Sequence, residues 1–136
     1  MIKSKFSISL HILTLLAHQK GQWLSSSYIA KSLNVNPVLV RKEIANLKAG
    51  GFIESKEGKN GGVKLLKKAT KIALSDIFKL AKGDENVLSL SRNTPNADCP
   101  IGKKINNQLE LVLNQVDDSI LSVLKQQTLE DFKNKF

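Results

Sequence analysis

Two helices joined by a very short turn are the feature that most constrains the fold of this chain. Asn36 and Pro37 mark the start of the second helix, because asparagine caps helices and proline lacks only an N–H that the first turn leaves unpaired. Ser25 is an N-cap candidate for the helix before it, so few residues remain for the turn. Apolar residues at helical spacing give the second helix one buried face: Val40, Ile44 and Leu47. This pair of helices predicts a helix-turn-helix.

A glycine-rich segment after the second helix predicts a small β-hairpin. A Gly-Gly pair ends that helix, and two short runs typical of strands follow at residues 52–54 and 63–66. Between them, residues 58–62 read Gly-Lys-Asn-Gly-Gly, a composition typical of a tight turn. A hairpin in this place forms a wing, so we assign residues 1–68 to a winged helix-turn-helix.

Apolar spacing predicts further helices on both sides of this unit. Residues 6–17 form a helix that packs on more than one side, and Ser75 is the candidate cap of a short helix that Gly83 closes. Residues 103–126 carry an apolar stripe along a helix of about 36 Å. The tail, residues 128–136, is expected to be a short and weakly held helix. The fold class is therefore mainly α with a small β-hairpin and a long C-terminal helix.

The net positive charge of the chain comes entirely from its first half. The chain has 136 residues, the size of one domain, and a formal net charge of +9. Residues 1–68 hold twelve Lys and Arg, Lys3 among them, against three Glu, whereas residues 69–136 hold nine basic and nine acidic side chains. Because the charge coincides with a helix-turn-helix, double-stranded DNA is the expected partner.

The helix-turn-helix and the wing supply the candidate DNA-binding residues. The second helix of such a motif enters the major groove, where an arginine such as Arg41 can bind guanine through two hydrogen bonds. The start of the first helix offers hydroxyls to phosphates, and the hairpin offers side chains to phosphates or the minor groove. The candidates are Ser26, Ser27, Asn36, Val38, Arg41, Lys42, Lys56, Lys59 and Asn60.

The long C-terminal helix predicts a homodimer. A helix of this length outruns so short a chain, so an identical helix of a second copy is expected to cover its apolar stripe. The candidate interface residues are Ile105, Leu109, Val112, Val116, Ile120 and Val123. Residues 69–102 would then hold a short helix and a sensory loop, since the segment from 83 to 102 lacks periodicity and is long for a structureless loop. Residues 103–136 would be the dimerisation helix and tail.

Three segments carry a resemblance to a known family: Ile29-Ala30, Leu47-Lys48-Ala49-Gly50 and the run from Ser55 to Leu65. They resemble the pattern of the Rrf-two (Rrf2, BadM-like) family of bacterial winged-helix repressors, and the likeness covers most of residues 1–126. It implies a homodimer that binds a palindromic operator, with the long helices forming the dimer interface.

Cys99 is the only cysteine of the chain, which excludes an intramolecular disulfide and favours a reducing, cytoplasmic setting. Members of the family that bind an iron–sulfur cluster have three cysteines in the loop before the last helix, so we expect no cluster and no other cofactor. Cys99 precedes a helix N-terminus and is a candidate redox sensor, with an inert thiol as the alternative. His11 and His18 lie seven residues apart, too far to share a metal ion, so we predict no metal site.

The favoured function is that of a sequence-specific, DNA-binding transcriptional regulator, a repressor in the first instance. Two alternatives are a winged-helix module whose basic face docks on an acidic protein or RNA, and a cysteine-based redox sensor of unknown output. A small enzyme that uses Cys99 with a distant histidine is a weaker one, because the sequence has no carboxylate pair or nucleophile motif for catalysis. We therefore predict no enzyme, no membrane partner, and an effector whose identity the sequence does not give.

Overall fold

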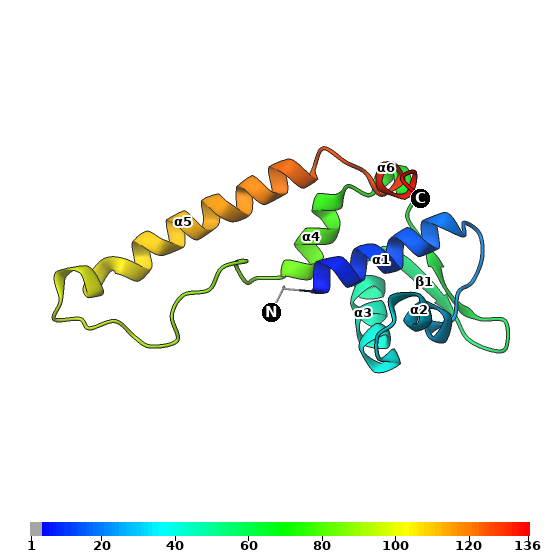
Figure 1. The fold of residues 1–136 in the computed structure, drawn as a ribbon, viewed down its shortest axis with the longest axis horizontal. Helices are drawn as coiled ribbons and strands as arrows, with labels where there is room; N and C mark the ends of the chain where they lie inside the picture. The colour runs from blue at the N-terminus through cyan, green and yellow to red at the C-terminus, as the bar shows by residue number, and fades with distance from the viewer. Residues whose placement is uncertain (1–3) are drawn as a thin grey trace.

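The computed structural model describes residues 4–136, so Lys3, which contributes to the basic half, lies outside the described residues. Its elements are α1 (Lys5–His18), α2 (Ser26–Leu33), α3 (Pro37–Ala49), β1 (Ile53–Lys56), β2 (Gly62–Leu65), the 3-10 helix η1 (Ala69–Lys71), α4 (Leu74–Lys82), α5 (Pro100–Leu124) and α6 (Leu129–Lys133). Figure 1 shows α5 and the loop before it extending away from the part built around α1. The predicted class, mainly helical with a two-stranded hairpin and a long C-terminal helix, is confirmed.

The two helices of the helix-turn-helix begin where their capping residues predict. The side chain of Ser25 accepts a hydrogen bond from the N–H of Tyr28 at 3.1 Å, and Asn36 Oδ1 accepts one from the N–H of Val38 at 2.8 Å. Between the helices, Asn34 adopts the left-handed conformation with φ 55°, which asparagine tolerates better than most residues. The turn is therefore only Asn34 to Asn36, as short as expected.

The wing is a hairpin extended by one residue from the segment before α2. β1 and β2 pair antiparallel, and Leu24 adds two backbone hydrogen bonds of 2.9 and 2.8 Å to Val63. This approach requires glycine at position 62, because a Cβ there would lie 2.4 Å from the carbonyl oxygen of Leu24 and φ is +145°. Both strands lie closer to the turn than the sequence predicts, at 53–56 and 62–65 instead of 52–54 and 63–66.

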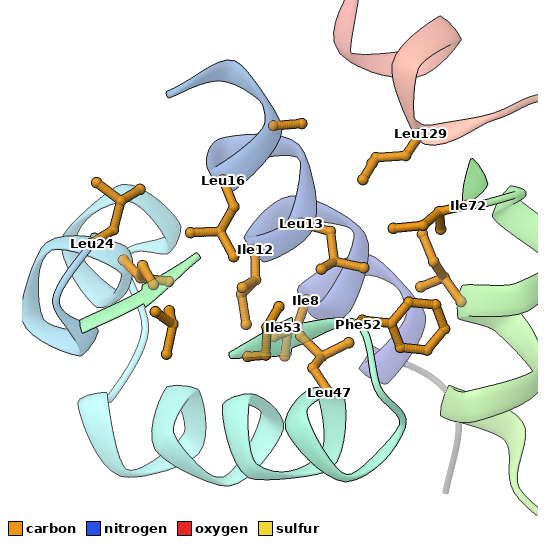
Figure 2. Packing of buried hydrophobic residues seen from close by; sticks show 14 of the residues in the cluster. Ile8, Ile12, Leu13, Leu16, Leu24, Leu47, Phe52, Ile53, Ile72 and Leu129 are labelled. Atoms are coloured by element: carbon orange, nitrogen blue, oxygen red, sulfur yellow. The ribbon is translucent and has the colours of Figure 1, made fainter. Parts of the chain in front are cut away.

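The main core surrounds α1. Ile12 and Leu13 of this helix are fully buried, and the cluster around them takes in α2, α3, the hairpin, the start of α4 and the tail (Figure 2). On α3, Val40 and Leu47 are fully buried and Ile44 is partly buried, as the helical spacing predicts. The orientation of α3 is thus determined by side chains that face α1 and the wing.

Ser75 does not cap α4, contrary to the sequence prediction. The N-cap is Ala73, so the helix begins at Leu74, two residues earlier than a cap at Ser75 would place it, and Ser75 is buried inside its first turn. The carboxylate of Asp76 accepts a hydrogen bond from the N–H of Ala73 at 2.9 Å and so stabilises the helix start from within. Burial of Leu74 in the core moves the helix start upstream of the serine.

The tail is firmly attached, so the prediction of a weakly held helix is wrong. Leu129 of α6 is fully buried in the main core. Its N–H donates to the carbonyl of Ile72 at 2.8 Å, and the N–H of Leu74 donates to Gln127 at 2.9 Å. Asp131 and Thr128 cap each other at the start of α6, and the hydrogen bonds from Thr128 lower the pKa of the Asp131 carboxyl.

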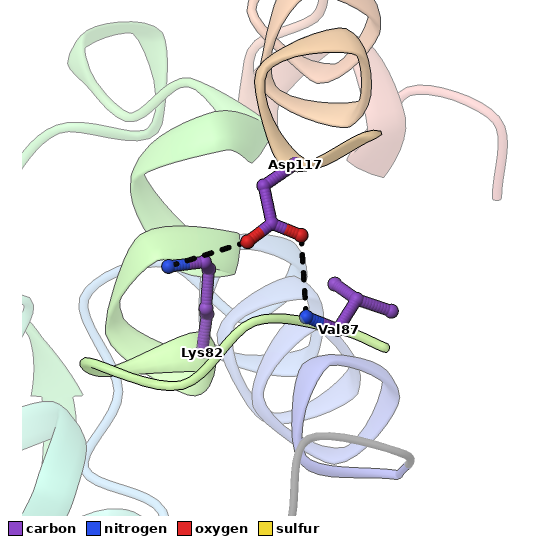
Figure 3. Close-up of polar contacts among 3 residues, drawn as sticks. All are labelled: Lys82, Val87 and Asp117. Carbon is purple, nitrogen blue, oxygen red and sulfur yellow. Dashed lines mark hydrogen bonds and ion pairs between the residues drawn. The ribbon is translucent and has the colours of Figure 1, made fainter. Parts of the chain in front are cut away.

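A buried carboxylate joins α5 to the rest of the protomer (Figure 3). Asp117 lies in the middle of α5, where one oxygen accepts a hydrogen bond from the N–H of Val87 at 3.2 Å. Its other oxygen is 3.5 Å from Nζ of Lys82, at the end of α4. These contacts hold the start of the loop from 83 to 99 against α5. Among residues 4–136, no helix is both long and apolar enough to cross a membrane.

Candidate nucleic-acid interface

One face of α3 is free of the core and carries the predicted base-reading side chains. Val38 is 64% exposed, and Arg41 and Lys42 are exposed on the following turn. Asn36 is exposed too, but its side-chain oxygen is already engaged as the helix cap. The exposed face continues toward the end of the helix at Lys48, which the sequence prediction did not include.

The first turn of α2 lies at the opposite end of that helix from the turn that leads to α3. Ser27 is exposed and Ser26 is half-buried, so both remain candidates for phosphate contacts. Tyr28, next to them, is 45% exposed, and its hydroxyl accepts a hydrogen bond from Gln19 Nε2 at 2.5 Å. The sequence prediction missed Tyr28, although its place in the first turn of this helix was a usable signal.

The predicted cations at the tip of the wing are exposed to solvent. Lys56 ends β1, and Lys59 and Asn60 lie in the turn, all exposed. At the base of the wing, Nζ of Lys48 donates a hydrogen bond to Ser55 Oγ at 2.7 Å. This contact links the end of α3 to β1.

The cations of α3 and the wing have no acidic partner of their own. Within residues 4–136 the ion pairs are Lys82–Asp117 and Lys133–Glu130, both outside α3 and the wing. The charges of Arg41, Lys42 and Lys59 are therefore available to a polyanion. Part of the basic excess lines a groove between the end of α1, the end of β2 and α6, whose walls include Lys20, Lys64 and Lys68.

Four of the six predicted dimer residues are partly covered within the protomer itself. Val112 and Val123 are 51% and 66% exposed, and Leu111, which was not predicted, is 60% exposed. The others are half-buried: Ile105, Leu109, Val116 and Ile120. A second uncovered apolar surface is a groove of about 470 Å³ between α1 and α6, with walls that include Phe6, Leu10, Leu15, Phe132 and Phe136.

Cys99 is exposed at the N-terminus of α5, one residue before Pro100. The backbone N–H of Gly102, and after it that of Ile101, lowers the pKa of the Cys99 thiol because both stabilise the thiolate. The predicted position just before a helix is therefore correct. Whether the thiol acts as a sensor stays a prediction.

Comparisons with known proteins agree over the whole chain. Residues 2–135 match the family model named Rrf2, described as an iron-dependent transcriptional regulator. The chain is 34% identical over 134 residues to YwnA of Bacillus subtilis (strain 168), named as an HTH-type transcriptional regulator, and the match covers 98% of each chain. A solved transcriptional regulator from Lactobacillus plantarum has a TM-score of 0.81 at 26% identity, over 97% of this chain and 89% of that one. CymR (YrzC), the global cysteine regulator of B. subtilis, shares the fold with a TM-score of 0.73 at 24% identity, over 100% and 98%.

The residues of this chain do not fit the iron that the family description names. Iron–sulfur clusters are held by several thiolates, and Cys99 is the only cysteine of the chain. Within residues 4–136, no group of three or more His, Cys, Asp and Glu side chains is arranged to hold a metal ion. His11 is instead hydrogen-bonded through Nε2 to Ser32 Oγ at 3.0 Å.

Proposed function

Since this chain belongs to the Rrf2 family of DNA-binding transcriptional regulators, we propose that it is a sequence-specific repressor that binds a palindromic operator as a homodimer. The observation that carries this proposal is the exposed, unpaired set of Val38, Arg41 and Lys42 on α3, next to the cations of the wing. This is the role of a regulator that binds without catalysing a reaction.

In the proposed complex, α3 enters the major groove and its first turns meet the base edges. Arg41 donates two hydrogen bonds to a guanine, and Val38 packs on a thymine methyl group. Ser26 and Ser27 bind phosphates at the start of α2, and the wing tip lies along the backbone or minor groove. These phosphate contacts add affinity that falls steeply as salt rises.

The homodimer is supported by apolar surface that one protomer leaves uncovered. On α5 the side chains of Leu111, Val112 and Val123 are exposed, and the groove between α1 and α6 has apolar walls, so both surfaces offer apolar contacts to a second copy. A second copy that covers them places two helix-turn-helix units on one duplex. Two-fold symmetry of the protein then requires two-fold symmetry of the operator.

Arg41→Ala tests the proposed base contact. We expect operator binding to become weaker by about 1 to 3 kcal/mol and the preference at one base pair to relax. Fluorescence anisotropy with the operator and its single-base variants, at two salt concentrations, measures both effects.

The control is Arg92→Ala, which removes the other arginine of the chain from the exposed loop before α5. This variant should bind the operator as the unsubstituted protein does. Uniform weakening of Arg41→Ala on every sequence would assign Arg41 to a phosphate instead. Equal losses for both arginines would mean that only net charge matters, and an acidic protein or RNA would become the better partner.

The lowered pKa of Cys99 favours a second, regulatory role for this thiol. Because the thiolate is the reactive form, the rate of alkylation by iodoacetamide should rise with pH through an inflection below that of a free cysteine. N-acetylcysteine amide measured in parallel supplies the reference. An inflection at or above the reference would contradict the effect of the α5 N–H groups.

The regulatory role itself needs a DNA readout. If oxidation of Cys99 controls the protein, peroxide should lower operator affinity, and Cys99→Ser should abolish that loss. The idea is wrong if Cys99→Ser retains both the affinity and its sensitivity to peroxide.

A further inference from the structure

Trp23 lies against two lysines of the wing. The centroid of its ring is 4.6 Å from Nζ of Lys64 and 5.9 Å from Nζ of Lys56. At these distances an ammonium group is attracted to the electron-rich face of an indole. Trp23 is the only tryptophan of the chain, and neither it nor Lys64 was among the predicted DNA-binding residues.

The register of the sheet explains why Trp23 meets Lys64. Leu24 pairs antiparallel with Val63, so the next pair along the strands is Trp23 and Lys64. Leu24 and Val63 are buried in the core, and side chains alternate between the two faces of a strand. Trp23 and Lys64 therefore share the face of the wing that is turned away from the core.

The same register brings Lys56 within reach of the ring. Lys56 pairs with Gly62 across the hairpin, and Gly62 has no side chain to separate Lys56 from Trp23. Position 62 cannot hold a larger residue, because a Cβ would collide with the carbonyl oxygen of Leu24 at 2.4 Å. The glycine that the fold requires thus keeps the surface open between the indole and the second lysine.

We propose that Trp23 is a positioning residue for DNA binding, whose indole holds the ammonium groups of Lys56 and Lys64 together on one face of the wing to meet the phosphate backbone. The proposal rests on the proposed function and extends the interface by two residues, Trp23 and Lys64. A surface lysine side chain that contacts nothing else loses rotamer entropy when it binds a phosphate. A lysine already held against a ring loses less, so preorganisation raises the affinity.

The charge of both lysines is available for this contact. Within residues 4–136 neither Lys56 nor Lys64 forms an ion pair, although Glu54 is the strand partner of Lys64. A cation–π contact leaves the other N–H donors of an ammonium free, because lysine has three. The lysines can therefore contact the ring and a phosphate oxygen at once.

The first test needs no DNA. In the free protein, the ring current of Trp23 should shift the side-chain methylene protons of Lys64, and to a smaller degree those of Lys56, in NMR spectra. Trp23→Leu should return these protons to the positions of an ordinary exposed lysine while the buried methyl signals of the core stay in place. Lysine signals that are unshifted in the unsubstituted protein would overturn the positioning role, whatever the protein does with DNA.

The second test is a double-mutant cycle on operator affinity. Trp23→Leu should weaken binding about fivefold, and Trp23→Phe, which keeps an aromatic face, should stay within about twofold of the unsubstituted protein. In a Lys56→Gln, Lys64→Gln background, Trp23→Leu should have no further effect, because its action passes through the lysines. The slope of affinity against salt concentration should already be reduced in that background.

The outcomes separate this inference from the proposed function. Equal losses from Trp23→Leu with and without the lysines would assign Trp23 to packing alone, and tighter binding of Trp23→Leu would mean that the ring holds the lysines away from DNA. Either result overturns the positioning role while the repressor proposal stands. If the unsubstituted protein binds no duplex although the lysine protons are shifted, the proposed function fails, and with it the purpose assigned to the contact.

Discussion

Val112→Asp is expected to dissociate the proposed dimer and to abolish tight operator binding. Val112 is 51% exposed in the protomer, so a charge there leaves the fold of one chain intact. In the dimer the same carboxylate would be buried close to apolar residues of the second copy, and aspartate is too short to reach solvent. We expect the dimer dissociation constant to rise by at least about 100-fold, or roughly 2.7 kcal/mol.

The loss on DNA follows from the loss of the dimer. A dimer brings its second reading helix to the duplex at a high effective concentration, which raises the overall affinity by about 10² to 10⁴. Val112→Asp should therefore bind a full operator no better than a half-site. Analytical ultracentrifugation at micromolar concentration and anisotropy on both duplexes measure the two effects.

Asn107→Asp is the matched control for this experiment. It adds the same charge to the same helix at an exposed position on the polar side of α5, with almost no change in volume. This variant should remain dimeric and bind the operator. If both variants stay dimeric, the apolar stripe of α5 is not the interface, and if both dissociate, the charge of the helix decides the oligomeric state.

Leu129→Ala is expected to destabilise the protomer by about 2 to 5 kcal/mol. The side chain of Leu129 is fully buried in the main core, and its removal leaves a cavity that the backbone pairing at Ile72 prevents from closing. Equilibrium unfolding in urea measures the change. All proteins must be compared at one protomer concentration, because the stability of a dimer depends on it.

Leu66→Ala controls for the loss of a leucine as such. Leu66 is 58% exposed after β2, so its truncation should change the free energy of unfolding by less than about 0.5 kcal/mol. Equal and small effects of the two substitutions would mean that the tail is weakly held after all. A large effect of Leu129→Ala alone would establish the tail as part of the folding unit.

Local chemistry made the helix-turn-helix predictable from sequence. Asn36 and Ser25 act within three residues of their own positions, and Pro37 acts on its own backbone, so no knowledge of the distant chain is needed. The exposure of Arg41 and Lys42 follows directly, because Val40 and Leu47 determine which face of α3 is buried. The features that expose the candidate site are thus contained in about 25 consecutive residues.

Contacts between distant segments were not predictable in this way. Asp117 has its partners 30 and more residues upstream, and the N–H of Leu129 donates to the carbonyl of the distant Ile72. The apolar spacing of α5 and α6 therefore does not indicate the role of either residue. The contact of Trp23 with Lys64 depends on the pairing of Leu24 with Val63. Leu24 lies outside the hairpin and is a single paired residue, so no strand pattern in the sequence indicates it. Ser75 misled the prediction because the core, rather than the serine, determines where α4 begins.

The most direct test of the central claim is a titration of a duplex selected by the protein from random sequences. Anisotropy at physiological salt should give saturation at two protomers per duplex on a two-fold symmetric site. Its affinity should exceed that for a scrambled duplex of equal length by at least about 1,000-fold. Equal affinity for both duplexes, or saturation by one protomer, would contradict a dimer that reads an operator with two copies of α3.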